Sequence, residues 1–161
     1  MATYGPEWFI NGDFANWTTD NPDDWILTGE SGVDPMVTEP VAGDSCRMFT
    51  SGSHIALRQD LLAADFGKPF RVKIDIIKAV AGSLRFRTGS TQIKPVFDSV
   101  GNNQVRFFTV DPGSQAMFLE RNVSGATNDF TFTNVSCREV IPGVDGMSMA
   151  LIMRSLASRK K

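Results

Sequence analysis

Hydrophobic and polar residues alternate in several short segments of this chain, and that alternation limits the fold more than any other feature of the sequence. From Phe70 to Ile76 every second residue is hydrophobic, and residues such as Arg71 and Lys73 lie between them. A period of two places one set of side chains in a core and the other in water, as in a half-buried β-strand. Residues 83–88 repeat the pattern.

Segments of this kind recur about every 8 to 12 residues, a spacing typical of all-β sandwiches and jelly rolls. Gly, Pro, Asn and Asp fill the turns between them, and no strand–helix–strand order indicates a parallel α/β fold. We therefore predict one antiparallel jelly-roll β-sandwich over residues 9–141, with a hairpin connection at Ala79–Gly82. The predicted strands are residues 9–14, 24–28, 48–61, 70–78, 83–88, 93–97, 105–110, 116–121 and 130–140.

Aromatic residues mark the start of the predicted sandwich. Phe14, Trp17 and Trp25 lie among turn-forming pairs such as Asn-Gly and Asn-Pro, with no helical period between them. This combination predicts a first strand, a wrapping loop and a second strand held to one core by the aromatic side chains. Trp17 and Trp25 are accordingly expected to be structural.

The two ends of the chain depart from the strand pattern. Residues 1–8 are predicted to form an N-terminal arm, and residues 142–161 a C-terminal tail with a short helix that Ser148 would cap. The first half of that helix is apolar on nearly every side, so it must pack on the chain's own sandwich or on a neighbouring subunit. For the second alternative, the predicted partner contacts are Trp8, Met147, Met149, Leu151, Ile152, Met153 and Leu156.

Composition limits the partners. The net charge is −2, and the acidic residues gather at the N-terminal end, where no Lys or Arg precedes Arg47. The chain has no dense basic stripe, so nucleic acid is not a predicted partner. It has no run of 18 apolar residues and no leader pattern, so neither a membrane span nor secretion is predicted.

Residues that carry chemistry are sparse. His54 is the only histidine, and no nucleophile elbow accompanies it. The acidic residues cluster in loops, and none is predicted to lie in the apolar setting that raises a catalytic pKa. Cys46 and Cys137 lie in strand-like segments and are expected to be small buried residues, with a disulfide as the alternative. We predict no enzyme activity, no cofactor and no metal site.

Arginines on the wet faces of the predicted strands are the best ligand-binding candidates. These are Arg85, Arg87 and Arg106, and Gln104 and Arg121 are further candidates for the wet face. Sugar binding usually adds an exposed aromatic platform, and these strands show none. An ordinary solvated sheet face is the alternative interpretation.

The pattern Asn-Gly-Asp-Phe at residues 11–14, followed by Trp17 and Trp25, resembles the start of carbohydrate-binding-module jelly rolls, close to the galactose-binding-like sandwiches. The segments IALRQDL and DFTFTNVSCREV resemble later strands of that family. The resemblance covers roughly residues 9–140 and implies the same fold. Many such modules are parts of bacteriophage tails, fibres and capsid decorations.

The resemblance also bears on metal binding. Family members often hold a structural calcium through an acidic residue after the first-strand Phe and an Asp in the last strand. Ala15 and Asn134 stand at those positions here. Asp13 and Asp129, with backbone carbonyls, would be the remaining oxygen ligands for a weak site.

From the resemblance we predict a non-enzymatic bacteriophage virion protein, a capsid decoration, fibre or tail-accessory component that attaches to other virion proteins through its termini. It would be made in the host cytoplasm, located in the virion and homo-oligomeric. The alternative is a glycan-binding module that recognises host or polysaccharide sugars.

Overall fold

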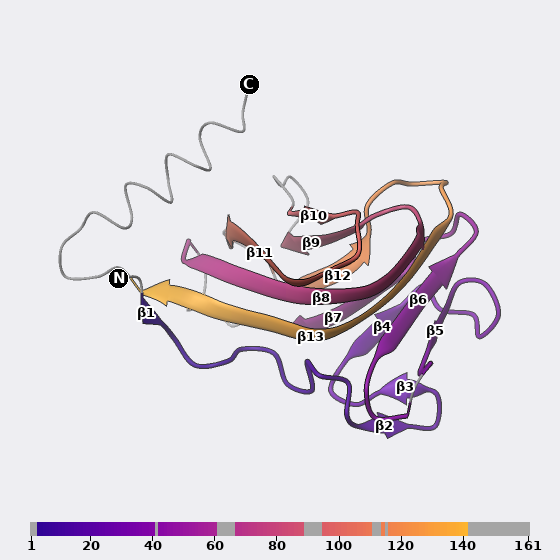
Figure 1. Cartoon of the computed structure of the whole chain (residues 1–161), viewed down its shortest axis with the longest axis horizontal. Coiled ribbons are helices and arrows are strands. Elements are labelled where there is room, and N and C mark those ends of the chain that lie inside the picture. The colour runs from indigo at the N-terminus through magenta and orange to yellow at the C-terminus, as the bar shows by residue number, and fades with distance from the viewer. Residues whose placement is uncertain are drawn as a thin grey trace.

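The chain folds into two packed antiparallel β-sheets in the computed structural model, which describes residues 3–40, 42–60, 67–88, 95–110, 114 and 116–141 (Figure 1). Within these residues the chain forms strands and irregular segments only. The strands are β1 (Thr3–Tyr4), β2 (Trp17–Thr18), β3 (Asn21–Pro22), β4 (Ile26–Thr28), β5 (Met36–Thr38), β6 (Cys46–Thr50), β7 (Ala56–Asp60), β8 (Pro69–Ala81), β9 (Leu84–Thr88), β10 (Val96–Phe97), β11 (Gly101–Thr109), β12 (Ala116–Arg121) and β13 (Asn128–Ile141).

The larger sheet has six strands in the order β11-β8-β13-β6-β5, with β1 paired to β13, and the smaller has five in the order β10-β9-β12-β7-β4. Strands β2 and β3 form a separate two-stranded ribbon. Figure 1 shows that β8 and β13 are long and bent, with β9, β10 and β12 on the inner side of the bend. The predicted all-β antiparallel sandwich is confirmed.

The core lies between the two sheets and follows the alternation of the sequence. On β8, Phe70, Val72, Ile74 and Ile76 are at most 1% exposed, and the residues between them are only partly buried. On β9, Leu84 and Phe86 alternate in the same way with the two arginines of that strand. Burial of each large side chain contributes about 1.5–3 kcal/mol. The other large, fully buried side chains include Phe14, Phe97, Phe130, Phe132, Met48, Ile55 and Leu57.

The predicted hairpin at Ala79–Gly82 is wrong. Strand β8 continues to Ala81, and the chain then crosses to β9 in the other sheet instead of returning beside β8. Gly82 makes the corner with φ of +81°, and a Cβ there would lie 2.6 Å from the carbonyl oxygen of Thr127. Only glycine fits this corner, because it combines a left-handed conformation with close backbone contact.

The predicted strand at residues 9–14 is also wrong, because Asn11 and Phe14 adopt left-handed conformations with φ of 50° and 58°. The Asn11 amide donates to the carbonyl oxygens of Asn16 and Asp23, each at 2.8 Å. Local hydrogen bonds of this type compete with a β-ladder. Phe14 is nevertheless fully buried, and Trp25 is 6% exposed, so the expected aromatic anchoring is present.

Residues 3–8 lie along the last strand and are not a separate arm. Thr3 pairs with Ile141 in β13, and the amides of Gly5 and Trp8 donate to the carbonyl oxygens of Glu139 and Cys137, both at 2.9 Å. The sequence missed this addition to the sheet because β1 is too short to alternate. Trp8 is half-buried against the core, in edge contact with the rings of Phe9 and Phe70.

The predicted tail helix in residues 142–161 lies outside the described residues, as do Met147, Met149, Leu151, Ile152, Met153 and Leu156. Their contacts with a partner stay a prediction. No helix in the described ranges could span a membrane. Cys46 and Cys137 are both buried and neither is in a disulfide bond, in agreement with the prediction of small buried residues.

Candidate functional site

The side of the five-stranded sheet that faces away from the core carries a row of arginine and apolar side chains. Residues directly opposite each other on paired antiparallel strands point to the same side of a sheet. Phe118 on β12 lies opposite Arg87 on β9 and Arg58 on β7, and Arg58 lies opposite Ile26 on β4. A second row places Glu120 opposite Arg85. We call this surface the outer face; its residues are Ile26, Arg58, Arg85, Arg87, Phe118 and Glu120.

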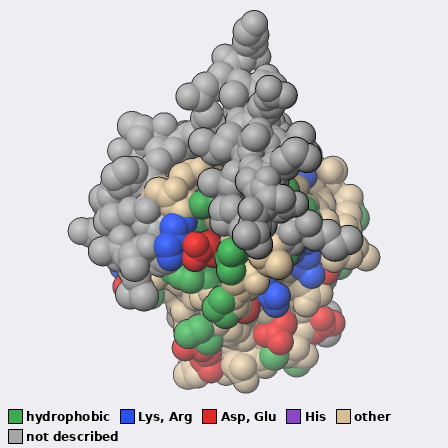
Figure 2. Space-filling model, turned by 90° about the vertical axis from the view of Figure 1, so that its left-hand side faces the viewer, with side chains coloured by type: hydrophobic (Ala, Val, Ile, Leu, Met, Phe, Trp, Pro, Cys, Tyr) green, Lys and Arg blue, Asp and Glu red, His purple; other side chains and the backbone are tan. Residues whose placement is uncertain are grey.

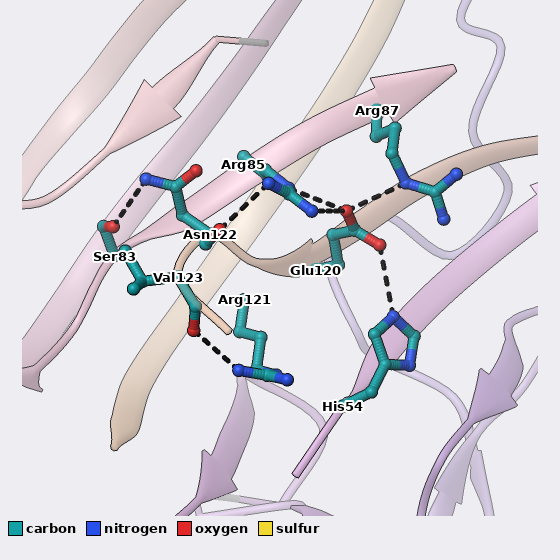
Figure 3. Close-up of polar contacts among 8 residues, drawn as sticks. All are labelled: His54, Ser83, Arg85, Arg87, Glu120, Arg121, Asn122 and Val123. Atoms are coloured by element: carbon teal, nitrogen blue, oxygen red, sulfur yellow. Dashed lines mark hydrogen bonds and ion pairs between the residues drawn. The ribbon is translucent and has the colours of Figure 1, made fainter. Parts of the chain in front are cut away.

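Glu120 organises the basic side chains of the outer face (Figure 3). Its Oε1 accepts hydrogen bonds from Nε of Arg85 at 2.7 Å and from Nε of Arg87 at 2.8 Å. Its Oε2 lies 3.3 Å from Nε2 of His54. Burial raises the pKa of Glu120, but the hydrogen bonds and charges of Arg87 and Arg85 outweigh burial and leave that pKa below its ordinary value. Glu120 is therefore a buried anion that fixes two cations in place.

Arg85 is held on its other side as well. Its Nη1 donates to the carbonyl oxygen of Asn122 at 2.9 Å, and the Asn122 amide donates to the hydroxyl of Ser83 at 3.0 Å. Figure 3 shows these bonds as a continuous chain that connects the end of β12 with the start of β9. The hydrogen-bonded network restricts the guanidinium of Arg85 to one orientation.

Arg87 covers the half-buried aromatic ring of the same row. Its guanidinium carbon lies 4.1 Å from the ring centre of Phe118, a cation–π contact. The sheet therefore presents a planar guanidinium stacked on a phenyl ring, with N–H donors at the rim.

Arg58, on the other side of Phe118, lies in a different environment. Its Nε is buried and has no hydrogen-bond partner, although the residue as a whole is partly exposed. Its cross-strand neighbours on the outer face are the side chains of Phe118 and Ile26.

A depression of about 340 Å³ adjoins the outer face at its β4 edge. Gln59 ties one wall to the sheet, because its amide donates to the carbonyl oxygen of Ile10 at 2.7 Å and accepts from the Ile10 amide at 3.1 Å. The lining combines apolar surface with carboxylate and amide groups: Trp8, Ile10, Asp24, Ile26, Gln59 and Asp60. Ile26 belongs to both surfaces, so the depression continues the outer face.

The structure brings together only two of the three arginines predicted to bind a ligand. Arg85 and Arg87 are neighbours on the outer face, whereas Arg106 lies on β11 in the other sheet, opposite the inward-facing Val72. The guanidinium of Arg106 lies 5.1 Å from the ring centre of Phe97 and covers the sandwich edge. Gln104 is also on β11, and Arg121 bonds to the carbonyl oxygen of Val123.

Sequence reasoning missed Phe118, Glu120 and Arg58. In residues 116–121 the apolar run Ala-Met-Phe-Leu hides the alternation, so Phe118 does not stand out as an outward-facing aromatic. The register of β12 in the sheet reveals the orientation of Phe118, because Met117 and Leu119 on either side of it are fully buried. The aromatic ring that the sequence did not reveal on this side of the sheet is Phe118, and Trp8 lines the adjoining depression.

A second depression, of about 380 Å³, lies on the six-stranded sheet beside the N-terminal segment, with Glu7, Asp13, Lys73 and Arg138 in its lining. Glu7 accepts hydrogen bonds there from the Ser136 hydroxyl and the Cys137 amide, both at 2.6 Å. The lining combines acidic and basic side chains, and its aromatic ring is that of the buried Phe9. The outer face is therefore the better candidate for a carbohydrate.

The residues considered for calcium are engaged otherwise. Asp129 accepts a bidentate pair of hydrogen bonds from Arg47 at 2.8 and 2.9 Å, and the Asn134 amide donates to Asp75 at 2.8 Å. Arg47 lowers the pKa of the Asp129 carboxyl through these bonds, against the effect of burial. In the part of the chain that the structure describes, no group of three or more His, Cys, Asp or Glu residues could hold a metal ion.

One acidic residue departs from the expectation that none lies in an apolar setting. Burial raises the pKa of Glu30 above its ordinary value, although the Val37 amide donates to its carboxylate at 2.7 Å, and the charge of Asp20 adds to the rise. Neither depression described above includes Glu30 in its lining. Glycoside hydrolysis needs two carboxyl groups across a substrate cleft, and Glu30 does not line one here.

Figure 2 shows the end of the sandwich on the left of Figure 1. Hydrophobic, basic and acidic side chains are mixed in its coloured part, and no continuous patch of one kind is visible there. Lys68 and Glu139 form an ion pair at 3.1 Å in the segments that reach this end.

The sequence matches no protein-family model and no curated protein. Solved structures do match. The enzymatically active domain of tailspike protein 4 of bacteriophage CBA120 is 18% identical with a TM-score of 0.54, over 83% of this chain and 21% of that chain. A family 29 carbohydrate-binding module is 11% identical with a TM-score of 0.50, over 86% of this chain and 89% of that chain. The chain thus spans about a fifth of the tailspike chain, at 21%.

These similarities show the fold. The chain has the jelly-roll fold of carbohydrate-binding modules, as the Asn-Gly-Asp-Phe pattern at residues 11–14 implied. A shared fold does not fix a ligand, so function rests on the surface that this chain builds on it.

Proposed function

We propose that this protein is a carbohydrate-binding module that holds a glycan on its outer face and in the adjoining depression, without catalysing a reaction. The observation that carries the proposal is the continuous row of Arg87, Phe118, Arg58 and Ile26, which ends at the depression that Trp8 helps to line. The fold similarity to a family 29 carbohydrate-binding module supports it.

The chemistry of the row suits a sugar ring. A pyranose has apolar C–H faces and a rim of hydroxyls, so it needs flat apolar surface with hydrogen-bonding groups around it. Phe118 with its stacked Arg87 supplies one flat surface, and Trp8 contributes apolar surface to the depression. Gln59 and Asp60 supply polar groups in that lining.

Rigidity supports the same function. Glu120 fixes Arg85 and Arg87 before any ligand arrives, so binding would order few side chains. Each long side chain immobilised on binding costs about 0.5–1.5 kcal/mol, and a preformed surface avoids much of that cost.

The test compares two phenylalanines in similar settings on opposite sheets. Phe118 lies under Arg87 on the outer face, and Phe49 lies 5.5 Å from the guanidinium of Arg47 on the six-stranded sheet. Wild type, F118A and F49A would be applied to a glycan array and titrated calorimetrically with the best ligand. We expect F118A to weaken binding about tenfold or more and F49A to leave it within twofold. Equal losses in both variants, or no glycan bound by the wild type, would contradict the proposal.

The second candidate function is a structural component of a bacteriophage particle. The fold similarity to the CBA120 tailspike domain favours it, and the two functions are compatible, since an adhesive module can be part of a virion. In this proposal the protein is located in the virion, forms homo-oligomers and binds other virion proteins through Trp8 and residues 142–161. Particles assembled with chains that lack residues 144–161 should lose the protein, as measured by mass spectrometry of purified particles. Full incorporation of the shortened chain would contradict attachment through the tail.

A further inference from the structure

Arg58 differs from the other arginines of the outer face in its partners. Glu120 neutralises Arg85 and Arg87 through contacts of 2.6 to 2.8 Å. Arg58 has a buried Nε that bonds to nothing, and no ion pair joins its guanidinium to an acidic residue among those the structure describes. A buried donor that stays unsatisfied destabilises the folded state, and a charged donor does so more strongly.

Among the described residues, the cross-strand neighbours of Arg58 offer its guanidinium no acceptor. On either side its cross-strand neighbours are the apolar side chains of Phe118 and Ile26. Two acidic residues share this side of the sheet: Asp60, two residues along β7 and in no ion pair with Arg58, and Glu120, whose oxygens are engaged by the other two arginines and His54. An anion placed beside Phe118 and Ile26 would therefore meet a cation that forms no ion pair with any acidic residue in the described ranges.

We propose that the glycan bound at the outer face is acidic and that Arg58 binds its carboxylate or sulfate group. This inference rests on the proposed function and specifies its ligand class. A guanidinium presents its donors in a fork that matches two anionic oxygens at once, so a uronic acid or a sulfated sugar satisfies it better than a neutral hydroxyl does. The apolar row of Phe118 and Ile26 would contact the ring of the same sugar.

The arrangement also sets specificity. The net charge of the protein does not attract an acidic glycan, because the protein carries −2 overall and Asp24 and Asp60 line the adjoining depression. Long-range attraction of any polyanion is therefore weak, and recognition depends on a local contact at Arg58. A neutral ligand would leave the guanidinium unpaired in a more desolvated site, so the bound state itself would select for an acid.

The experiment uses one polymer in charged and neutral forms. Polygalacturonate and its fully methyl-esterified form share a backbone and differ in the carboxylate, and a sulfated galactan tests the other anionic group. The proteins are wild type, R58Q, R58K and R71Q, with Arg71 as the matched control, since it lies on β8 in the other sheet and contacts Tyr4. Affinities come from calorimetry and affinity electrophoresis at fixed salt, after circular dichroism has confirmed that each variant is folded.

We expect wild type to bind at least one anionic polymer about tenfold or more tightly than the esterified one. R58Q should remove that preference and R58K should restore part of it, whereas R71Q should keep it. Preference for polygalacturonate identifies a carboxylate ligand, and preference for the sulfated galactan identifies a sulfate ligand. Equal losses in R58Q and R71Q would show non-specific attraction and overturn the inference.

The failure of this inference is distinguishable from that of the proposed function. If F118A loses a neutral glycan but R58Q binds every ligand as wild type does, the outer face is a carbohydrate site for neutral sugars and the inference alone is overturned. If no glycan of any kind binds, both are overturned.

Discussion

Gly12 and Val135 approach so closely that no side chain fits between them. The Val135 amide donates to the Gly12 carbonyl oxygen at 2.7 Å, and a Cβ on Gly12 would lie 2.0 Å from the Val135 carbonyl oxygen. Trp25 also donates from its indole nitrogen to the carbonyl oxygen of Asn11 at 3.0 Å. The Asn-Gly-Asp-Phe pattern therefore seats the N-terminal segment on β13, and its role is structural.

Replacing Gly12 with alanine should destabilise the protein. The added methyl group must push the segment off β13 and break the bond to Val135, so we expect G12A to lower the free energy of unfolding by about 2 kcal/mol or more. Urea denaturation followed by tryptophan fluorescence measures it. G5A is the matched control, because a Cβ on Gly5 would meet its nearest atom at an ordinary 3.5 Å. A G12A variant as stable as G5A would contradict the structure.

Removal of the Glu120 carboxylate should also destabilise the fold. E120A leaves Arg85 and Arg87 without their shared anion, and we expect a loss of about 3 kcal/mol in the free energy of unfolding. D98N changes an exposed acid on the surface and should stay within about 0.5 kcal/mol of wild type. Chemical denaturation at pH 7 measures the stability of both variants. Equal stability of E120A and D98N would contradict the role of Glu120 in holding the two arginines.

The same carboxylate makes stability depend on pH in a defined direction. The pKa of Glu120 is lower in the folded protein than its ordinary value of 4.5. The ionised carboxylate therefore makes its full contribution to the free energy of unfolding above pH 4.5, and that contribution is lost as the pH falls through the pKa of the folded state. We expect the stability difference between wild type and E120Q to be constant near neutral pH and to shrink below pH 4.5. A difference that grows on acidification would have the wrong sign.

Glu7 should control how tightly the N-terminal segment is held. Burial raises its pKa, but hydrogen bonds from Ser136, Cys137 and Arg138 outweigh burial and lower it. We expect E7Q to destabilise the protein by about 1–2 kcal/mol and to speed hydrogen exchange at the amides of Gly5 and Trp8. Exchange at the central amides of β9, far along the chain from this contact, is the internal control. Unchanged exchange at Gly5 and Trp8 would contradict the role of Glu7.

The two cysteines should be unreactive in the native state. Burial, with a smaller contribution from the charge of Glu30, raises the pKa of the Cys46 thiol, and Cys137 is fully buried. We expect a thiol reagent to modify neither residue in buffer and both in denaturant, and a reducing agent to leave the melting temperature unchanged. Rapid modification of the folded protein would contradict this burial.

The sequence predicted most of the sandwich because one face of each long strand is buried. Strand β12 has the predicted bounds, and β8 buries the predicted side chains. The two failed predictions depended on contacts with residues outside the segment concerned. The crossing at Gly82 looks like a hairpin until Thr127 is placed beside it, and residues 9–14 look like a strand until Asn11 closes its local hydrogen bonds.

The candidate site was predictable only in part, for a similar reason. Arg85 and Arg87 could be assigned to a wet face from local alternation alone. Their pairing with Glu120 and the row through Phe118 require the register of β12 against β9 and β7. Arg106 was misplaced because it lies on β11 in the six-stranded sheet, on the same side as the buried Val72, and the local pattern of residues 105–110 reveals neither the sheet nor that face.

The antiparallel pairing of Thr3 with Ile141 has a mechanical consequence. The described ends of the chain leave the sandwich at one corner, so a load applied between them acts across the hydrogen bonds of β1 and β13 in succession. These bonds would break one after another, as in unzipping, and not together, as in shear. The protein should therefore yield at low force at this corner while the outer face is still folded.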